Sequence, residues 1–224
     1  MDIKQLARTA CTRFFSAIPA LGLIFFLPAG TFDYWQAWLY MALLFTPMFF
    51  LMRYLIKNDP ALLERRMKMK EKAAEQSLII KLSYMYFLAT FLLPGFDRRF
   101  GWSNVPLWLV LFADALVLAG YILVMLVFKE NSYAARTVEV EEGQKVIDTG
   151  PYAVVRHPMY VGVGLLYVLT PPALGSAWAM IPAIFLIPLL IARIVSEERI
   201  LAKELKGYTE YQQKVRYRLL PGVW

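Results

Sequence analysis

The stretch from Gly150 to Gly162 holds the densest group of side chains in this sequence that can do chemistry, reading Gly-Pro-Tyr-Ala-Val-Val-Arg-His-Pro-Met-Tyr-Val-Gly. Proline suits the first position of a helix and disfavours helix at the residue before it, so Pro158 predicts a helix start with His157 near its N-cap. The free N–H groups and positive dipole end of a first helical turn attract anions. Arg156 and His157 would flank such a site, whose natural occupant is a carboxylate or a phosphate.

Tyr160 follows His157 by three residues, so the two side chains can share one side of the helix start. A structural interpretation carries equal weight. An arginine and a histidine beside a membrane often only anchor to lipid headgroups, and an aromatic residue there fits an interfacial belt. This segment by itself leaves both interpretations open.

A second charged group follows the last apolar segment and consists of Arg193, Glu197, Glu198 and Arg199. The short turn at 171–175 makes the last two apolar segments antiparallel neighbours, which returns both glutamates to the face of Arg156 and His157. Carboxylates beside cations can hold a zwitterion, with its carboxylate on Arg or His and its ammonium on Glu. S-adenosylmethionine has this charge pattern. Alternatively, adjacent Glu and Arg residues at a helix exit are commonly only solvated.

The elements that must position these groups are apolar helices. The chain has 224 residues, of which 59% are apolar and 18% charged, against about 25% charged residues in a soluble domain. Uncharged runs of about 18 or more residues are typical of membrane spans. Six spans are expected, near residues 14–32, 34–52, 77–96, 105–128, 158–170 and 177–192. The fold class predicted is therefore all-α, a polytopic membrane helical bundle with about six transmembrane helices, the fifth of them short.

The basic residues predict the orientation of this bundle. They gather at the N-terminus, in 53–76 (including Lys68, Lys70 and Lys72), in 129–157 and after 192, whereas only Arg98 and Arg99 lie on the opposite side. By the positive-inside rule both termini and the candidate site are cytosolic. The net charge of +7 is interpreted as topology and attraction to anionic membrane lipids, and no nucleic-acid partner is expected.

The same pattern limits the chemistry. No soluble stretch much exceeds 30 residues, and a Rossmann domain needs several βαβ units of about 30 residues each, so none is expected. Gly162-Val163-Gly164 lacks a third glycine and is no dinucleotide fingerprint. One cysteine, Cys11, and one histidine exclude a disulfide framework and clustered Cys or His metal sites. The chain is divided into a four-helix N-terminal region, 1–128, and a region of cytosolic loop, helical hairpin and tail, 129–224.

From about Asn131 to Trp224 the sequence resembles the isoprenylcysteine carboxyl methyltransferase and phospholipid methyltransferase group of integral membrane enzymes. The motifs that carry the resemblance are Gly-Pro-Tyr at 150–152, Arg-His-Pro-x-Tyr-x-Gly at 156–162, Glu-Glu at 197–198, and a tail with spaced tyrosines at 207–221. The resemblance implies cytosolic S-adenosylmethionine in a pocket between the 129–157 loop, the start of the fifth helix and the tail. It also implies a lipophilic small-molecule or lipidated acceptor that enters from the bilayer.

Carried over position by position, the resemblance implies a set of site residues. The cofactor would contact Gln144, Lys145, Val146, Ile147, Tyr152, Arg156, His157, Pro158, Met159, Tyr160, Glu197 and Glu198. Arg193, Glu197 and Glu198 would be catalytic, with Arg193 near the acceptor. Gln144 stands where histidine is usual, which puts a side-chain role there in doubt, and the spacing leaves open which glutamate binds the cofactor.

The reaction expected is in-line methyl transfer from the sulfonium to an oxygen, nitrogen or sulfur. A prenylcysteine carboxylate is the leading acceptor by resemblance, with a phospholipid amine and a small thiol as alternatives. A non-catalytic transport or lipid-binding protein would be favoured by charges near the midplane. Only Asp114 lies that deep, and a structural hydrogen bond is its expected role.

Overall fold

The computed structural model describes residues 2–67, 74–134 and 140–224, so Lys68, Lys70 and Lys72 lie outside the described residues. The elements in chain order are α1 (Ile3–Ala29), α2 (Trp35–Asn58), α3 (Pro60–Met67), α4 (Ala74–Phe100), α5 (Leu107–Glu130), the 3₁₀ turn η1 (Gly150–Ala153), α6 (Pro158–Ala173), α7 (Met180–Glu204) and α8 (Tyr208–Lys214). Within these ranges there is no strand, and the predicted all-α class is confirmed.

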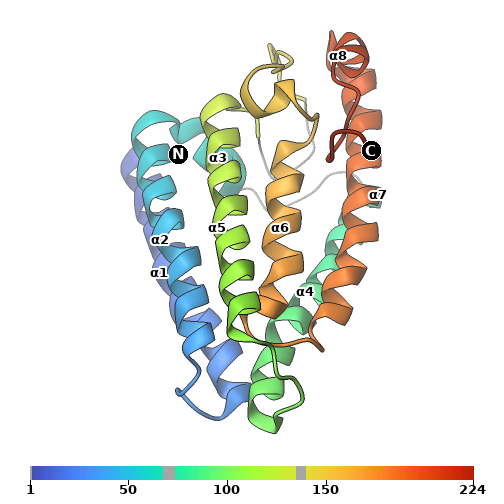
Figure 1. Ribbon diagram of the computed structural model, residues 1–224. Coiled ribbons are helices and arrows are strands. Elements are labelled where there is room, and N and C mark those ends of the chain that lie inside the picture. The colour runs from blue at the N-terminus through green and yellow to red at the C-terminus, as the bar shows by residue number, and fades with distance from the viewer. Residues whose placement is uncertain (1, 68–73, 135–139) are drawn as a thin grey trace.

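The long helices run up and down beside one another, and the short elements gather at one end of the bundle (Figure 1). The N-terminus, α3, η1 and α8 lie at that end, while the turns that follow α1, α4 and α6 lie at the other. Helix α5 packs along α6, and α7 packs against both α4 and α6. The candidate site segments therefore meet at the end of the bundle that also holds α3.

Four helices, α1, α2, α5 and α7, are long and apolar enough to cross a membrane. These helices make the chain a membrane protein, although the count of about six spans is not confirmed. Helix α6 has 16 residues, which at about 1.5 Å per residue covers less than a hydrocarbon core of about 30 Å. The expectation that this segment is short is correct, and spans at α4 and α6 stay predictions.

The two helices that carry the candidate site, α6 and α7, extend beyond their predicted ends. Helix α6 continues through Pro171 and Pro172 to Ala173, and the chain turns at Gly175, whose φ of 74° suits glycine. Helix α7 continues from its apolar part to Glu204. The charged group that begins at Arg193 is therefore helical and is carried on a rigid element.

A close contact between glycines fixes α6 against α5. A Cβ atom on Gly162 would lie 2.7 Å from the carbonyl oxygen of Gly120 and 2.8 Å from a methyl of Val124. Only glycine permits this approach, which sets the height and rotation of the α6 start. Gly164 lies elsewhere on the helix surface, where a Cβ atom would meet only a methyl of Leu190 at 3.8 Å.

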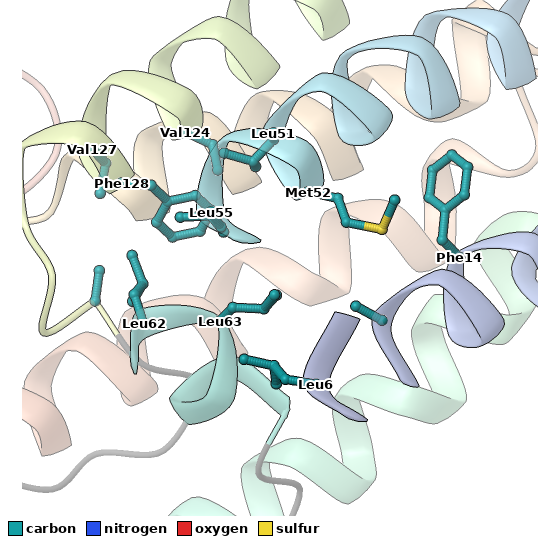
Figure 2. Packing of buried hydrophobic residues seen from close by; sticks show 12 residues of the cluster. Leu6, Phe14, Leu51, Met52, Leu55, Leu62, Leu63, Val124, Val127 and Phe128 are labelled. Carbon is teal, nitrogen blue, oxygen red and sulfur yellow. The ribbon is translucent and has the colours of Figure 1, made fainter. Parts of the chain in front are cut away.

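Helix α3 is held by a hydrophobic cluster that joins α1, α2, α3 and α5 (Figure 2). Leu62 and Leu63 are buried in it, against residues such as Leu55 and Phe128. The backbone N–H of Leu62 donates to the Asp59 carboxylate at 2.9 Å, which caps the start of the helix. The cluster thus fixes the direction in which the arginines that follow Leu63 leave the helix.

Asp114 differs from its expected role. It is buried in α5, as a position facing the bundle interior requires. Neither carboxyl oxygen has a hydrogen-bond partner among the described residues, so the structural hydrogen bond expected for it is wrong.

Candidate active site

A cavity of about 110 Å³ lies between the 129–157 loop, the start of α6, the end of α7 and α8. Of the predicted site residues it is lined by Gln144, Lys145, Val146, Ile147, Tyr152, Arg156, His157, Pro158, Met159, Tyr160, Arg193 and Glu197. It is also lined by residues that were not assigned to the site from the sequence, which are Asn131, Tyr133, Ala134, Leu201, Leu205, Tyr208 and Tyr211. The structure thus brings the two charged groups together, although Glu198 and Arg199 do not line the cavity.

Glu198 lies behind the cavity wall and is buried. One carboxylate oxygen accepts a hydrogen bond from Arg156 Nε at 2.7 Å and lies 3.1 Å from His157 Nε2. The other accepts from Arg218 Nε at 2.8 Å. The anion that Arg156 and His157 contact is therefore this glutamate, where the sequence predicted a bound carboxylate or phosphate.

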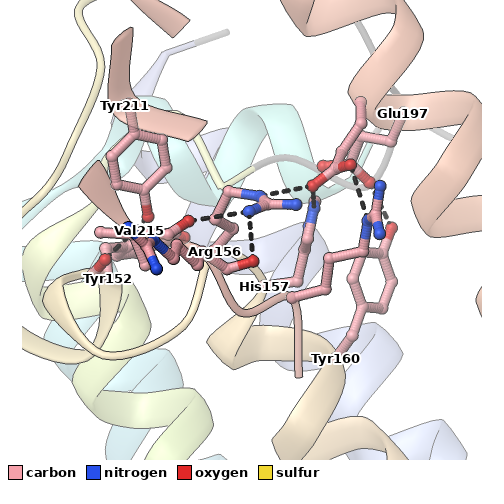
Figure 3. A network of polar contacts seen from close by, with 10 residues as sticks. Tyr152, Arg156, His157, Tyr160, Glu197, Tyr211 and Val215 are labelled. Atoms are coloured by element: carbon pink, nitrogen blue, oxygen red, sulfur yellow. Dashed lines mark hydrogen bonds and ion pairs between the residues drawn. The ribbon is translucent and has the colours of Figure 1, made fainter. Parts of the chain in front are cut away.

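Other donors of Arg156 hold the tail. Arg156 Nη1 donates to the carbonyl oxygens of Val215 at 2.7 Å and Arg216 at 2.8 Å (Figure 3). The backbone N–H groups of Arg156 and His157 donate to the carbonyls of Tyr217 and Arg218, at 2.9 and 3.0 Å. The tail is thereby tied along the start of α6. His157 is the N-cap residue of that helix, as predicted.

Tyr160 contacts two further charged residues of the site, Glu197 and Arg193, and Figure 3 shows Tyr160 beside Glu197. Its hydroxyl donates to Glu197 Oε2 at 2.6 Å and accepts from Arg193 Nε at 2.9 Å. Glu197 and Glu198 thus have different surroundings, because Glu197 lines the cavity and Glu198 does not. The contact also orients the Arg193 guanidinium toward the start of α6.

A second cavity, of about 490 Å³, lies among α4, α6 and α7. Most of its wall is apolar and includes Phe87, Leu186 and Leu190, with Gly164 leaving room on the α6 side. Met159, Tyr160 and Arg193 line both cavities. The first cavity, which we call the polar cavity, and the second, which we call the apolar cavity, therefore adjoin at the first turn of α6.

Two tyrosines of the tail, Tyr208 and Tyr211, also line the polar cavity. The Tyr211 hydroxyl donates to the carbonyl oxygen of Tyr152 at 2.7 Å, and Asn131 Nδ2 donates to the Tyr152 hydroxyl at 2.9 Å. Burial raises the pKa of Tyr152 to about 12, so its phenol stays neutral. The Tyr208 hydroxyl is buried and has no hydrogen-bond partner among the described residues. The spaced tyrosines of the tail were the sequence signal for these groups, but they were not assigned to the site.

Across 2–67, 74–134 and 140–224, no group of three or more His, Cys, Asp and Glu side chains is arranged to hold a metal ion.

Comparison with protein families gives the class of this site. Residues 108–207, which include α5, α6, α7 and the loop before α6, match the phospholipid methyltransferase family. This match confirms the resemblance to the integral membrane methyltransferases, and it identifies the chain as an enzyme of the methyltransferase class. It disfavours the non-catalytic alternative. No curated protein sequence matches the chain.

We predict that Glu198→Ala destabilises the protein much more than Glu197→Ala. Removing one partner of a buried ion pair leaves uncompensated charge and costs about 3–5 kcal/mol, and here Arg156 and His157 would both be left buried. Thermal unfolding of the detergent-solubilised protein measures the difference, and Glu198→Gln is a milder variant. Equal unfolding midpoints for the two alanine variants would contradict this role.

Proposed function

We propose that the protein is an S-adenosylmethionine-dependent methyltransferase that holds the cofactor in the polar cavity and a lipophilic acceptor in the apolar one. The observation that carries the proposal is that the two cavities share Tyr160 and Arg193. A methyl group can pass between two ligands only where their binding sites adjoin. The residues that line both cavities mark that place.

The polar cavity fits a zwitterionic cofactor. Cationic Lys145 and anionic Glu197 line it, so it offers charges of both signs. Val146 and Leu201 add apolar surface, and the buried Tyr208 hydroxyl still lacks a partner that a ligand can supply. We propose that the residues that line the cavity hold the cofactor. Arg156 and Glu198 act through their ion pair, which positions the start of α6 against α7. Glu198 has only this role, whereas Arg156 also lines the cavity.

The residues of the chain act mainly by alignment and exclusion of water. When bound, S-adenosylmethionine supplies an electrophilic methyl group on a sulfonium. In that transfer an oxygen of the acceptor carboxylate would bond to the methyl carbon as the carbon–sulfur bond breaks, with the electron pair of that bond left on sulfur. A carboxylate is already ionised at neutral pH, so no proton has to be removed. Arg193, held by Tyr160, orients that carboxylate.

The acceptor we propose is a prenylcysteine-type carboxylate. A phospholipid amine is the second candidate, and the description of the matched family favours it. Ammonium must lose a proton before it attacks, which requires a base such as Glu197. Glu197 already accepts a hydrogen bond from Tyr160, which lowers its availability as a base and supports the carboxylate.

The site is proposed to face the cytosol. The loop and tail around it, together with α3, carry many of the basic residues of the chain. These elements lie at one end of the bundle (Figure 1). Cytosolic loops of membrane proteins carry the excess of Lys and Arg, which supports this orientation.

Tyr208→Phe tests the cofactor site. Loss of one hydrogen bond of about 0.5–1.5 kcal/mol should weaken binding of S-adenosylhomocysteine by about two- to tenfold. Calorimetric titration of the purified protein measures the affinity. Tyr217→Phe is the matched control, because Tyr217 lies in the same tail, is 39% exposed and does not line the cavity. Equal loss in both variants, or none in Tyr208→Phe, would count against the site.

Gly164→Phe tests the acceptor cavity. The bulky ring should fill the space beside Leu190 and reduce methyl transfer at least tenfold, whereas Gly164→Ala should keep it. The assay follows labelled methyl from S-adenosylmethionine into an S-prenylated mercaptocarboxylic acid (which keeps a free carboxylate), phosphatidylethanolamine and a prenyl thiol. Label in the acid supports the proposed acceptor, and label in the phospholipid alone supports the amine. Full activity of Gly164→Phe would show that the acceptor binds elsewhere.

A further inference from the structure

Asn131 is the C-cap residue of α5, and two hydrogen bonds fix the orientation of its side-chain amide. The backbone N–H of Tyr133 donates to Asn131 Oδ1 at 2.9 Å. The amide nitrogen, Nδ2, is thereby turned to the Tyr152 hydroxyl, to which it donates at 2.9 Å. A backbone N–H can only donate, so exchanging the oxygen and nitrogen of this amide would place two donors against each other.

The fixed amide decides how the Tyr152 hydroxyl can bond. An amide NH₂ group is a donor only, so the phenol oxygen accepts from Asn131 and the phenol hydrogen points elsewhere. No described residue accepts that hydrogen. Both side chains line the polar cavity. Because a polar hydrogen enclosed in a protein normally finds an acceptor, the Tyr152 hydroxyl is a donor prepared for a ligand of this cavity.

The position of Tyr152 selects the ligand group that it meets. Its hydroxyl lies within electrostatic reach of the Glu197 carboxylate, which lines the same cavity. The ammonium of a zwitterionic cofactor belongs beside that carboxylate, and the cofactor's own carboxylate is attached to the same carbon atom. A carboxylate only accepts hydrogen bonds, which matches the O–H that Tyr152 presents. Lys145 also lines the cavity and adds positive charge.

We infer that Asn131 is a positioning residue that fixes the Tyr152 hydroxyl as the donor to the carboxylate of the cofactor's amino-acid group. This inference rests on the proposed function and assigns one group of the cofactor to one side chain. Asn131 acts through Tyr152, and what it contributes is the direction of the hydrogen bond. A bond from a neutral donor to an ionised acceptor is stronger than one between neutral groups, so this direction matters for affinity.

Asn131→Asp reverses the direction of the bond at nearly constant side-chain size. One carboxylate oxygen can still accept from the backbone N–H of Tyr133. The other oxygen can only accept, so the Tyr152 hydroxyl donates to it and presents a lone pair to the ligand carboxylate. Tyr152→Phe removes the same donor without any change of charge, and it keeps the ring that packs in the wall.

The test is calorimetric titration of the full chain with S-adenosylhomocysteine and with its decarboxylated analogue, which keeps the ammonium. Both variants should bind S-adenosylhomocysteine at least about tenfold more weakly, because a hydrogen bond to a charged group is lost. Neither variant should weaken binding of the analogue by more than about twofold. A role in packing alone would weaken the binding of both ligands equally.

Asn58→Asp is the matched control. Asn58 is the last residue of α2, and its Nδ2 donates to the carbonyl oxygen of Tyr54 at 2.8 Å. It does not line the polar cavity. The substitution therefore makes the same chemical change at the same end of the bundle (Figure 1), and it should leave the affinity for both ligands unchanged.

The outcomes separate the inference from the proposed function. Equal losses for the two ligands, unchanged affinity in Asn131→Asp, or the same losses in Asn58→Asp would overturn the role of Asn131 and leave the cofactor site standing. Full affinity of Tyr152→Phe for S-adenosylhomocysteine would overturn the role of its hydroxyl, whether or not Asn131→Asp folds. Failure of the parent protein to bind S-adenosylhomocysteine would contradict the proposed function itself.

Discussion

The buried carboxylate of Glu198 is the interaction on which the site depends. A carboxylate away from water is strongly unfavourable unless cations and hydrogen bonds surround it, and here Arg156, His157 and Arg218 do so. These groups come from the start of α6 and from the tail, while Glu198 comes from the end of α7. One anion therefore joins three segments, and none of them can move away without leaving buried charge unpaired.

The geometry of α7 places one glutamate in the ion pairs that fix the site and the next glutamate at the cavity. Consecutive residues of a helix point about 100° apart, so adjacent glutamates face different surroundings. Glu198 points to the basic groups that fix the wall, and Glu197 points to the cavity, where it accepts from Tyr160. The contact of Gly162 with Gly120 fixes the other side of α6. The start of α6, where the two cavities adjoin, is consequently fixed by α7 on one side and by α5 on the other.

Much of this arrangement could be predicted from sequence, because helix starts and apolar runs are local signals. Pro158 indicated the start of α6, and the hairpin indicated that α7 returns to the same end. The rotation of a helix about its axis has no such local signal, so the different roles of Glu197 and Glu198 could not be assigned. Arg66 is distant in sequence from the motifs, and only tertiary packing brings it to the apolar cavity. Tyr208 belongs to the tyrosine motif of the tail, but the motif does not indicate which of its side chains turn toward the polar cavity. For the same reason the sequence could not show that Asp114 has no hydrogen-bond partner among the described residues.

The central claim is that the cavity joining the loop, α6, α7 and the tail is where the cofactor binds. Hydrogen exchange of the solubilised protein with and without S-adenosylhomocysteine tests it most directly. The account predicts slower exchange in 144–160 and in 205–218, because a ligand would tie these segments together, and no change at the opposite end, in 101–112. Protection confined to that opposite end, or no protection at a saturating concentration of ligand, would contradict it.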